Sequence, residues 1–240
     1  MKNREKRLLL LMLMVAVLSC NKPANVAAPA AVNIINAIPT SQGVIPVFGT
    51  TDAPHYFANA REIGYGGVAL YSPVGGSIAL YIVQSSDTGD ANPKNDVFYG
   101  NLNLVAGGIY SLFLAGENTN SDTVFVQDHL LAFSDSSAAV RFVNLSTGSQ
   151  PITVNIQGNQ PNDTEFGNLS YKAVSEFKKY SAKSSVPGYY NFEIRDQKTD
   201  TLLVTFQWGY TLYRNNTLII SGSEAPGSST PLQIIQMNNF

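Results

Sequence analysis

The chain repeats itself, and this repeat constrains its fold more than any other feature. Residues 31–37 (AVNIINA) match residues 139–145 (AVRFVNL), which lie 108 positions later. Near the other end of the repeat, residues 110–116 (YSLFLAG) match residues 216–222 (NTLIISG) with an offset of 106. Two copies of just over 100 residues predict two tandem domains, because a solenoid is built from shorter and more numerous units.

Within each copy the residue pattern is that of β-strands. Residues 140–143 (VRFV) and 190–195 (YNFEIR) alternate apolar and polar side chains, as half-buried strands do. Turns rich in Gly, Asn and Ser separate such segments at intervals of about 8–12 residues. Together these features predict two tandem antiparallel β-sandwiches. Only residues 174–183 could instead form a helix, and they fit a polar-faced strand equally well.

The composition agrees with an all-β chain and excludes several classes of protein. Charged residues make up 13% of the chain, about half of the usual share of roughly 25%. Asn, Ser and Thr carry the polarity instead, with 59 residues among the 240. A net charge of −2 offers no basic footprint for nucleic acid. The single cysteine excludes a disulfide framework and a cysteine-based zinc cluster.

The first twenty residues predict a targeting signal. Four basic residues lie within residues 2–7, and an apolar run follows at residues 8–18 (LLLLMLMVAVL). Eleven apolar residues match the h-region of a secretory signal and are too few to span a bilayer core, which takes roughly 20. Residues 17–20 (VLSC) resemble the bacterial lipobox, whose cysteine is lipidated and becomes the first residue after cleavage. We therefore expect a lipid on Cys20; the alternative is an idle cysteine behind an ordinary cleavable signal.

The lipid predicts where the protein resides. Each buried CH₂ group of an acyl chain contributes about 0.8 kcal/mol, so several chains make a stable membrane anchor. An Asp directly after the cysteine would resemble an inner-membrane retention signal, but this chain has Asn21 there. The residue therefore favours the outer membrane, and it leaves open whether the protein faces the periplasm or the cell surface. Removal of residues 1–19 leaves 11 basic and 16 acidic side chains, a net charge of about −5. This charge further disfavours binding to nucleic acid or to anionic lipid surfaces.

The segments divide the chain as follows. We expect a signal peptide at residues 1–19, and the lipidated cysteine with a Pro/Ala tether at residues 20–30. The first β-sandwich domain then occupies residues 31–128 and the second occupies residues 138–240. The linker at residues 129–137 (HLLAFSDSS) is short, which predicts that the two domains contact each other.

Three segments carry motifs of a known family: residues 139–158 (AVRFVNLSTGSQPITVNIQG), 186–195 (VPGYYNFEIR) and 104–116 (LVAGGIYSLFLAG). They resemble the opening V-R-F-V-N strand, the central VPAG-Y strand and the closing A-G-x-x-Y strand of a bacterial envelope domain family of unknown function. The second copy departs from the closing pattern at residues 208–213 (WGYTLY), and the first lacks a Pro-Gly at residues 74–76 (VGG). The resemblance implies an immunoglobulin-like sandwich in a secreted or anchored protein, and it implies no activity.

The polar residues do not form a recognisable catalytic set. The two histidines, His55 and His129, lack a partner at ligand spacing and are interpreted as solvated loop or boundary residues. The sequence contains neither a nucleophile elbow nor a phosphate-binding loop. We therefore predict a protein that is not an enzyme and that needs no metal or other cofactor. Residues 86–96 (SDTGDANPKND) carry five acidic or amide side chains that could bind a cation, but polar turns have the same composition.

Aromatic residues and two short patterns are the remaining candidates for binding and modification. Trp208, Tyr210 and Tyr213 surround a Gly turn and could stack on the C–H face of a sugar. The alternative for Trp208 is a side chain that fills the sandwich core. Thr123 and Thr201 lie in Asp-Thr-aliphatic triplets, which resemble the O-glycosylation signal of envelope proteins in some Bacteroidota.

The sequence thus predicts a non-catalytic, lipid-anchored cell-envelope protein that binds a partner through its two sandwiches. Another envelope protein would dock on a sheet face or an edge strand. The alternative is a carbohydrate-binding accessory lipoprotein of an outer-membrane uptake system, with a glycan as its ligand. Nucleic acid is not expected as a partner.

Overall fold

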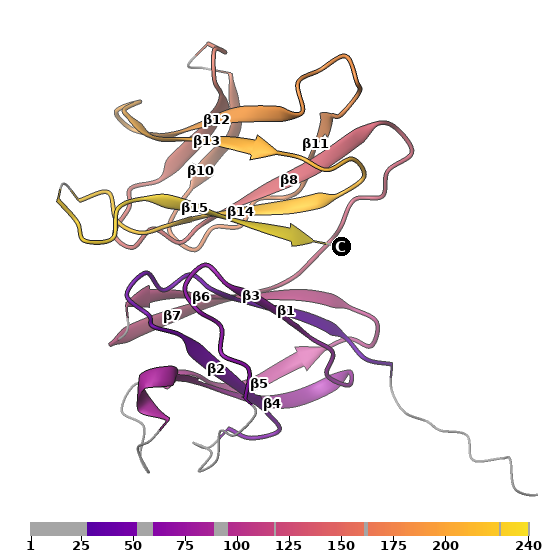
Figure 1. Ribbon diagram of the computed structural model, residues 1–240, viewed down its shortest axis with the longest axis vertical. Coiled ribbons are helices and arrows are strands. Elements are labelled where there is room, and N and C mark those ends of the chain that lie inside the picture. Colours follow the sequence, from indigo (N-terminus) through magenta and orange to yellow (C-terminus); the bar gives the residue numbers. More distant parts are fainter. Residues whose placement is uncertain are drawn as a thin grey trace, which may run out of the picture.

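The computed structural model describes residues 28–51, 60–88, 96–117, 119–160, 163–225 and 227–239. These residues form fifteen strands and one short 3₁₀ helix, η1 (Ser85–Asp87). The strands make four sheets, which stack as four layers along the long axis of the molecule (Figure 1). The prediction of an all-β chain with two sandwiches is confirmed.

The first sandwich consists of an outer and an inner sheet. The outer sheet has the order β2 (Val44–Phe48), β4 (Gly76–Gln84), β5 (Asp96–Leu104), and the inner sheet has the order β3 (Val68–Tyr71), β1 (Ala31–Asn36), β6 (Ile109–Glu117), β7 (Asn120–Gln127). Successive side chains of a strand point to opposite faces. Leu80 and Ile82 of β4 therefore both reach the core, where they pack with Ile34 and Leu112 of the inner sheet.

The second sandwich has the same plan with a more aromatic core. Its outer sheet has the order β10 (Thr164–Leu169), β9 (Ile152–Ile156), β12 (Tyr189–Asp196), β13 (Leu202–Gly209), and its inner sheet has the order β11 (Lys178–Ser181), β8 (Ser137–Asn144), β14 (Asn215–Ser221), β15 (Gln233–Asn239). Phe142, Phe192 and Trp208 are fully buried between these sheets. Residues 174–183, which the sequence left open between helix and strand, contain strand β11.

Both inner sheets contain one parallel strand pair. Strand β1 pairs antiparallel with β3 but parallel with β6, and β8 pairs antiparallel with β11 but parallel with β14. A parallel neighbour requires a crossover connection, and in both copies the chain passes through the outer sheet before it returns. The same departure from purely antiparallel pairing occurs twice, so the sequence repeat is also a repeat of topology.

Equivalent asparagines close the end of β1 and of β8. Asn36 Nδ2 donates to the Ile63 carbonyl oxygen at 3.0 Å, and Asn36 Oδ1 accepts from the Ile38 backbone N–H at 3.1 Å. Asn144, 108 positions later, donates to the carbonyl oxygen of Leu169 at 2.9 Å and accepts from the N–H of Ser146 at 3.0 Å. Each amide thereby satisfies buried backbone groups where the strand turns into a loop.

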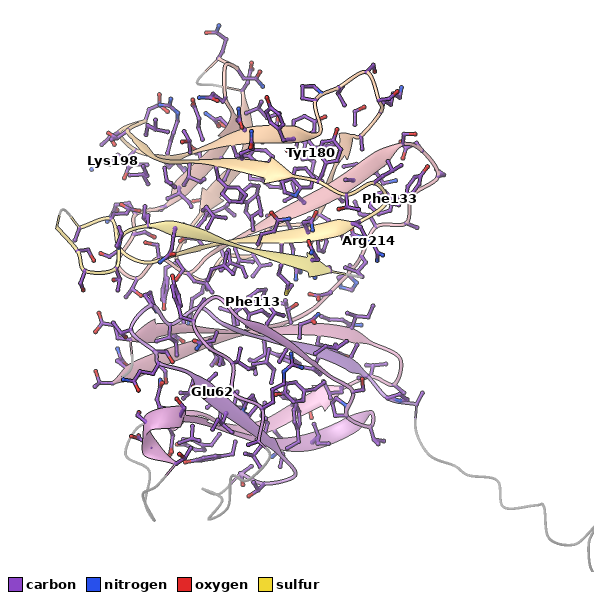
Figure 2. All side chains as sticks on the ribbon, in the orientation of Figure 1. Glu62, Phe113, Phe133, Tyr180, Lys198 and Arg214 are labelled. Carbon is purple, nitrogen blue, oxygen red and sulfur yellow. The ribbon has the colours of Figure 1, made fainter. Side chains whose placement is uncertain are left out.

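The two inner sheets pack against each other. Nearly all residues of β1, β6, β8 and β14 are buried, because one face of each strand lies in its own core and the other lies at this interface. Phe113 of the first sandwich lies there, in one apolar cluster with Val143 and Ile219 of the second (Figure 2). The alternation at residues 140–143 predicted a half-buried strand; β8 is instead buried on both faces.

Candidate functional site

Several predicted sites lie outside the described residues. These are Cys20, His55 and residues 89–95 of the candidate cation loop. Among the residues that are described, no group of three or more His, Cys, Asp or Glu side chains could hold a metal ion. That part of the chain also has no helix with the length and apolar character needed to cross a membrane.

Trp208 belongs to the core of the second sandwich. Its side chain is fully buried, it donates from Nε1 to Asn216 Oδ1 at 3.1 Å, and its ring stacks on Phe192 at a centroid distance of 6.1 Å. A ring without an exposed face cannot stack on a sugar. The structure therefore favours the alternative that the sequence offered, a tryptophan that fills the core.

The two tyrosines near Trp208 do not build a platform with it. The Tyr210 ring is tilted by 57° against the Trp208 ring, with 5.6 Å between the centroids, and its hydroxyl donates to the Pro187 carbonyl oxygen at 2.6 Å. Tyr213 is 52% exposed, but it lies beside Phe133 of the interdomain segment, with 6.3 Å between the ring centroids. Tyr210 thus packs against the core beside Trp208, whereas Tyr213 lies at the interdomain segment.

The two threonines of the predicted O-glycosylation triplets differ in solvent exposure. Thr201 lies in an exposed turn before β13, where Thr199 donates a hydrogen bond of 2.9 Å to its hydroxyl. Thr123 lies within β7 and is half-buried. Modification of Thr201 would need no change in the fold, whereas modification of Thr123 would place a glycan against the inner sheet.

A buried ion pair joins the two sandwiches, and the sequence did not predict it. Nη2 of Arg141, on β8, lies 2.6 Å from Oδ1 of Asp128, which follows β7. Arg141 also donates from Nε to Thr217 Oγ1 at 2.9 Å, and the Ser111 hydroxyl donates to Asp128 Oδ2 at 2.7 Å. The guanidinium lies 4.7 Å above the Phe177 ring. Burial lowers the pKa of Arg141, and the Asp128 carboxylate opposes this shift.

A hollow of about 230 Å³ lies beside this ion pair, with His129, Glu176 and Phe177 among its lining residues. The Arg141 side chain also lines it, but its charge is already matched by Asp128. An anion that entered this hollow would compete with Asp128 for the guanidinium. The ion pair is therefore best explained as a structural contact between the two sandwiches.

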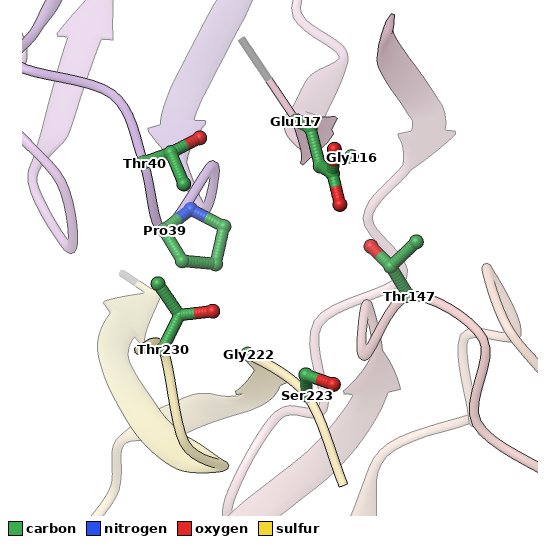
Figure 3. A pocket seen from close by; sticks show the side chains of 8 residues that line it. All are labelled: Pro39, Thr40, Gly116, Glu117, Thr147, Gly222, Ser223 and Thr230. Atoms are coloured by element: carbon green, nitrogen blue, oxygen red, sulfur yellow. The ribbon is translucent and has the colours of Figure 1, made fainter. Parts of the chain in front are cut away.

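Two polar hollows lie on the seam between the sandwiches. The first, of about 80 Å³, is lined by Pro39, Thr40, Gly116, Glu117, Thr147, Gly222, Ser223 and Thr230 (Figure 3). The second, of about 250 Å³, is lined by Gly116, Glu117, Asn120, Ser121, Asp122, Thr147 and Tyr171. The two share Gly116, Glu117 and Thr147, and together we call them the interdomain cleft.

Equivalent positions of the repeat meet in this cleft. Gly116 is the penultimate residue of β6, and Gly222, 106 positions later, directly follows β14. Both glycines have a positive φ, 83° and 94°. A Cβ atom at Gly116 would lie 2.4 Å from the Asn120 carbonyl oxygen, and one at Gly222 would lie 2.3 Å from that of Pro231. Glycine is needed at both positions, because neither the backbone angle nor the space admits a side chain.

The cleft lies at the end of the molecule opposite to the point where the chain enters β1. Parallel β1 and β6 end at the same edge of the sheet, and so do β8 and β14. Pro39 and Thr147 each lie three positions after the last residue of β1 and β8, respectively. The entry to β1 is at the other edge, where Gly107 N–H donates to the Pro29 carbonyl oxygen (Figure 1). One strand of six residues, about 20 Å, separates the two ends.

Hydrogen bonds and an ion pair hold the wall of the larger hollow. Lys172 Nζ lies 2.9 Å from Asp122 Oδ1, which joins the second sandwich to β7 of the first. The neighbouring Tyr171 shares a hydrogen bond with Thr147. Burial raises the pKa of the Tyr171 phenol, and the negative charge of Asp122 raises it further. The phenol therefore stays protonated at neutral pH and can donate a hydrogen bond.

The fold and this cleft define the class of the protein: a tandem β-sandwich protein with a polar hollow between its two domains. The family described as "Domain of unknown function (DUF4397)" matches residues 30–155, slightly more than half of the chain. The chain therefore belongs to this family. The matched residues cover the first sandwich, strand β8 and all but the last residue of strand β9.

Other known proteins add little to this assignment. No curated protein matches the chain. A candidate adhesin from Bacteroides ovatus is 10% identical, with 89% of this chain and 95% of that chain covered and a TM-score of 0.26. The family 26 carbohydrate-binding module of Eubacterium rectale Amy13K, solved with maltoheptaose, is 10% identical, with 88% and 97% covered and a TM-score of 0.25. At these scores neither structure informs the fold or the ligand of this chain.

Proposed function

We propose that the protein is a non-catalytic, lipid-anchored module of the cell envelope that binds a partner at the interdomain cleft. The lipid on Cys20 fixes the chain to the outer membrane, and the tether at residues 20–30 leads into β1. The observation that carries the proposal is the position of the cleft, at the opposite end of β1 from this entry. A module anchored in this way presents the cleft away from the membrane.

The interface between the sandwiches supports a binding role. Apolar side chains from both inner sheets form one cluster, and the Arg141–Asp128 ion pair lies next to it. Large apolar interfaces hold domains in a fixed relation, whereas small polar ones allow relative motion. Because both sandwiches contribute walls to the interdomain cleft, the cleft keeps its geometry without a ligand. This lowers the entropic cost of binding.

A second candidate function is that of a carbohydrate-binding accessory lipoprotein beside an outer-membrane transporter. The lining of the larger hollow favours it, because one tyrosine ring lies among hydroxyl, amide and carboxylate groups. Both candidates use the same cleft and differ in the chemistry of the partner, protein or glycan.

In-cell photo-cross-linking tests the proposed function. A photoreactive residue replaces Asn120, which is exposed at the cleft, in the full chain expressed in its own host. The matched control carries the same residue in place of Val105, which is 63% exposed at the tether end of the first sandwich. We expect a defined adduct, identified by mass spectrometry, from position 120 and not from position 105. Equal adducts from both positions, or none from position 120, would contradict the proposal.

A further inference from the structure

We propose that the interdomain cleft binds one ring of a neutral sugar, with Tyr171 as the stacking surface and Glu117, Asn120 and Asp122 as partners of its hydroxyl groups. This inference rests on the proposed binding function and names the class of ligand. It differs from the aromatic site suggested by the sequence, which used Trp208, a residue that is buried in the core.

The lining residues have the chemistry that a sugar ring requires. A pyranose presents an apolar C–H face and a rim of hydroxyl groups, each of which both donates and accepts hydrogen bonds. The hollow offers one aromatic ring, Tyr171, together with the carboxylates of Glu117 and Asp122 and the amide of Asn120. Carboxylates accept strong hydrogen bonds from hydroxyl groups, and the amide accepts and donates.

Contacts with neighbouring residues position Asp122 and Tyr171 before a ligand arrives. Asp122 Oδ1 accepts from the Thr123 backbone N–H at 2.9 Å and also contacts the Lys172 ammonium at 2.9 Å. Tyr171, half-buried, is positioned by its hydrogen bond to Thr147. Side chains that are held in this way lose little rotamer freedom on binding.

The volume of the cleft suits a single ring. The larger hollow measures about 250 Å³, slightly below the roughly 300–1,000 Å³ of pockets that enclose drug-sized ligands. The adjoining hollow of about 80 Å³ has space for one substituent of the ring. A terminal sugar unit of a glycan fits this shape, since the rest of the glycan can extend into solvent.

The charge of the cleft disfavours the other ligand classes. Glu117 and Asp122 are acidic, and Lys172 already pairs with Asp122, so the site has an excess of negative charge. An anionic ligand such as a phosphate would be repelled. An apolar ligand would have to desolvate these groups without hydrogen bonds in return. An organic cation is the remaining competing ligand, and the test includes spermidine as its representative.

The test uses the full chain, purified in a detergent without a sugar headgroup, on an array of immobilised neutral oligosaccharides of hexoses and N-acetylhexosamines. We expect binding to at least one terminal sugar, and we expect Tyr171→Ala to weaken it by about tenfold or more. Tyr171→Phe keeps the ring and should stay within about threefold. Tyr189→Ala, which removes an exposed tyrosine of the second sandwich's outer sheet, is the control without effect.

Glu117→Gln keeps the test valid if Tyr171→Ala does not fold, because Glu117 is exposed at the end of β6. We expect it to weaken binding by about fivefold, since a neutral acceptor makes weaker hydrogen bonds than a carboxylate. A blank array from folded protein, or binding that neither variant changes, would overturn the inference. Calorimetric binding of spermidine without sugar binding would overturn it as well. A blank array together with a protein cross-linked from position 120 would overturn only the sugar and leave the proposed function intact.

Discussion

The guanidinium of Arg141 on β8 lies 2.6 Å from the carboxylate of Asp128 at the end of the first sandwich, and the two side chains are 3% and 0% exposed. Moving two such charges out of water costs several kcal/mol for each ion. Here the cost is offset by their mutual attraction and by hydrogen bonds from Ser111 and to Thr217. The pair therefore favours one relative placement of the sandwiches, because another placement would separate the two charges and lose their mutual attraction.

Asp128→Asn should destabilise the protein strongly. The amide no longer neutralises Arg141, so the guanidinium is left as an uncompensated charge at the interface. Removal of one partner of a buried pair costs about 3–5 kcal/mol, to be measured by chemical denaturation. Asp135→Asn, which removes an exposed carboxylate of the interdomain segment, is the matched control and should change little. A double variant, Asp128→Leu with Arg141→Met, should recover most of the loss; failure to recover would mean that the charge is not the cause.

Phe113→Ala tests the interface between the inner sheets. The Phe113 ring is fully buried in the cluster that both sandwiches share. Its truncation should lower the free energy of unfolding by about 3–5 kcal/mol. Phe125→Ala, which truncates a 36% exposed ring on neighbouring β7, should cost about 1 kcal/mol.

Calorimetry adds a second readout for this interface. We expect the wild-type protein to unfold in one cooperative transition, because the cluster couples the two sandwiches. Phe113→Ala should separate that transition into two. Two transitions in the wild-type protein would show that the interface does not couple the sandwiches.

Asn36→Ala and Asn144→Ala should destabilise the protein to the same extent. The two amides make equivalent bonds to a backbone N–H and a backbone carbonyl in the two copies of the repeat. Each substitution leaves buried backbone groups without partners, which costs about 1–3 kcal/mol. Asn101→Ala, at an exposed position of β5, is the control for the loss of an amide. A large cost in one copy alone would contradict the equivalence of the two networks.

Alkaline pH should weaken the second sandwich through Tyr180. Burial raises the pKa of the Tyr180 phenol, and the hydrogen bond and charge of Glu165 raise it further. The unfolded phenol has a pKa near 10, so above that pH the unfolded state loses a proton that the folded state keeps. Stability from this group is complete below about pH 10 and falls above it, by up to about 1.4 kcal/mol per pH unit. Chemical denaturation at pH 9 to 11 should show that the free energy of unfolding falls less steeply with pH for Tyr180→Phe than for the wild-type protein. An identical fall in both proteins would exclude Tyr180 as a source of the pH dependence.

The sequence predicted the two sandwiches because a repeat and an alternation of residue types are local properties that can be read without coordinates. It did not predict the burial of Arg141, because alternation indicates that one face of a strand is polar but not what covers that face. The cover is the other inner sheet, and the matching charge, Asp128, lies at the end of β7. A single arginine in an otherwise apolar strand was the only available signal.

The candidate site escaped sequence reasoning for the same physical reason. Glu117 and Tyr171 are 54 positions apart, belong to different sandwiches and form no motif. Glu117 ends β6, whereas Tyr171 lies in the loop after β10, which the hydrogen bond of 2.7 Å from the Lys172 N–H to the Asn144 carbonyl oxygen holds at the end of β8. Trp208 drew attention because tryptophan is conspicuous in a sequence. Its neighbours in space, Phe192 and Tyr180, enclose it instead of leaving a face open to a ligand.

Cys20→Ala should move the protein from the membrane fraction to the soluble fraction. The proposed anchor requires the sulfur of this cysteine for attachment of the lipid, and each buried CH₂ group of an acyl chain contributes about 0.8 kcal/mol to membrane binding. Ser19→Ala is the matched control, because it keeps a small residue before the cysteine. We expect this control and the wild-type protein alike to fractionate with the outer membrane, and their amino-terminal peptides to carry the mass of the acyl chains. If Cys20→Ala stays with the membrane after a high-salt wash, the anchor is not a lipid on this residue.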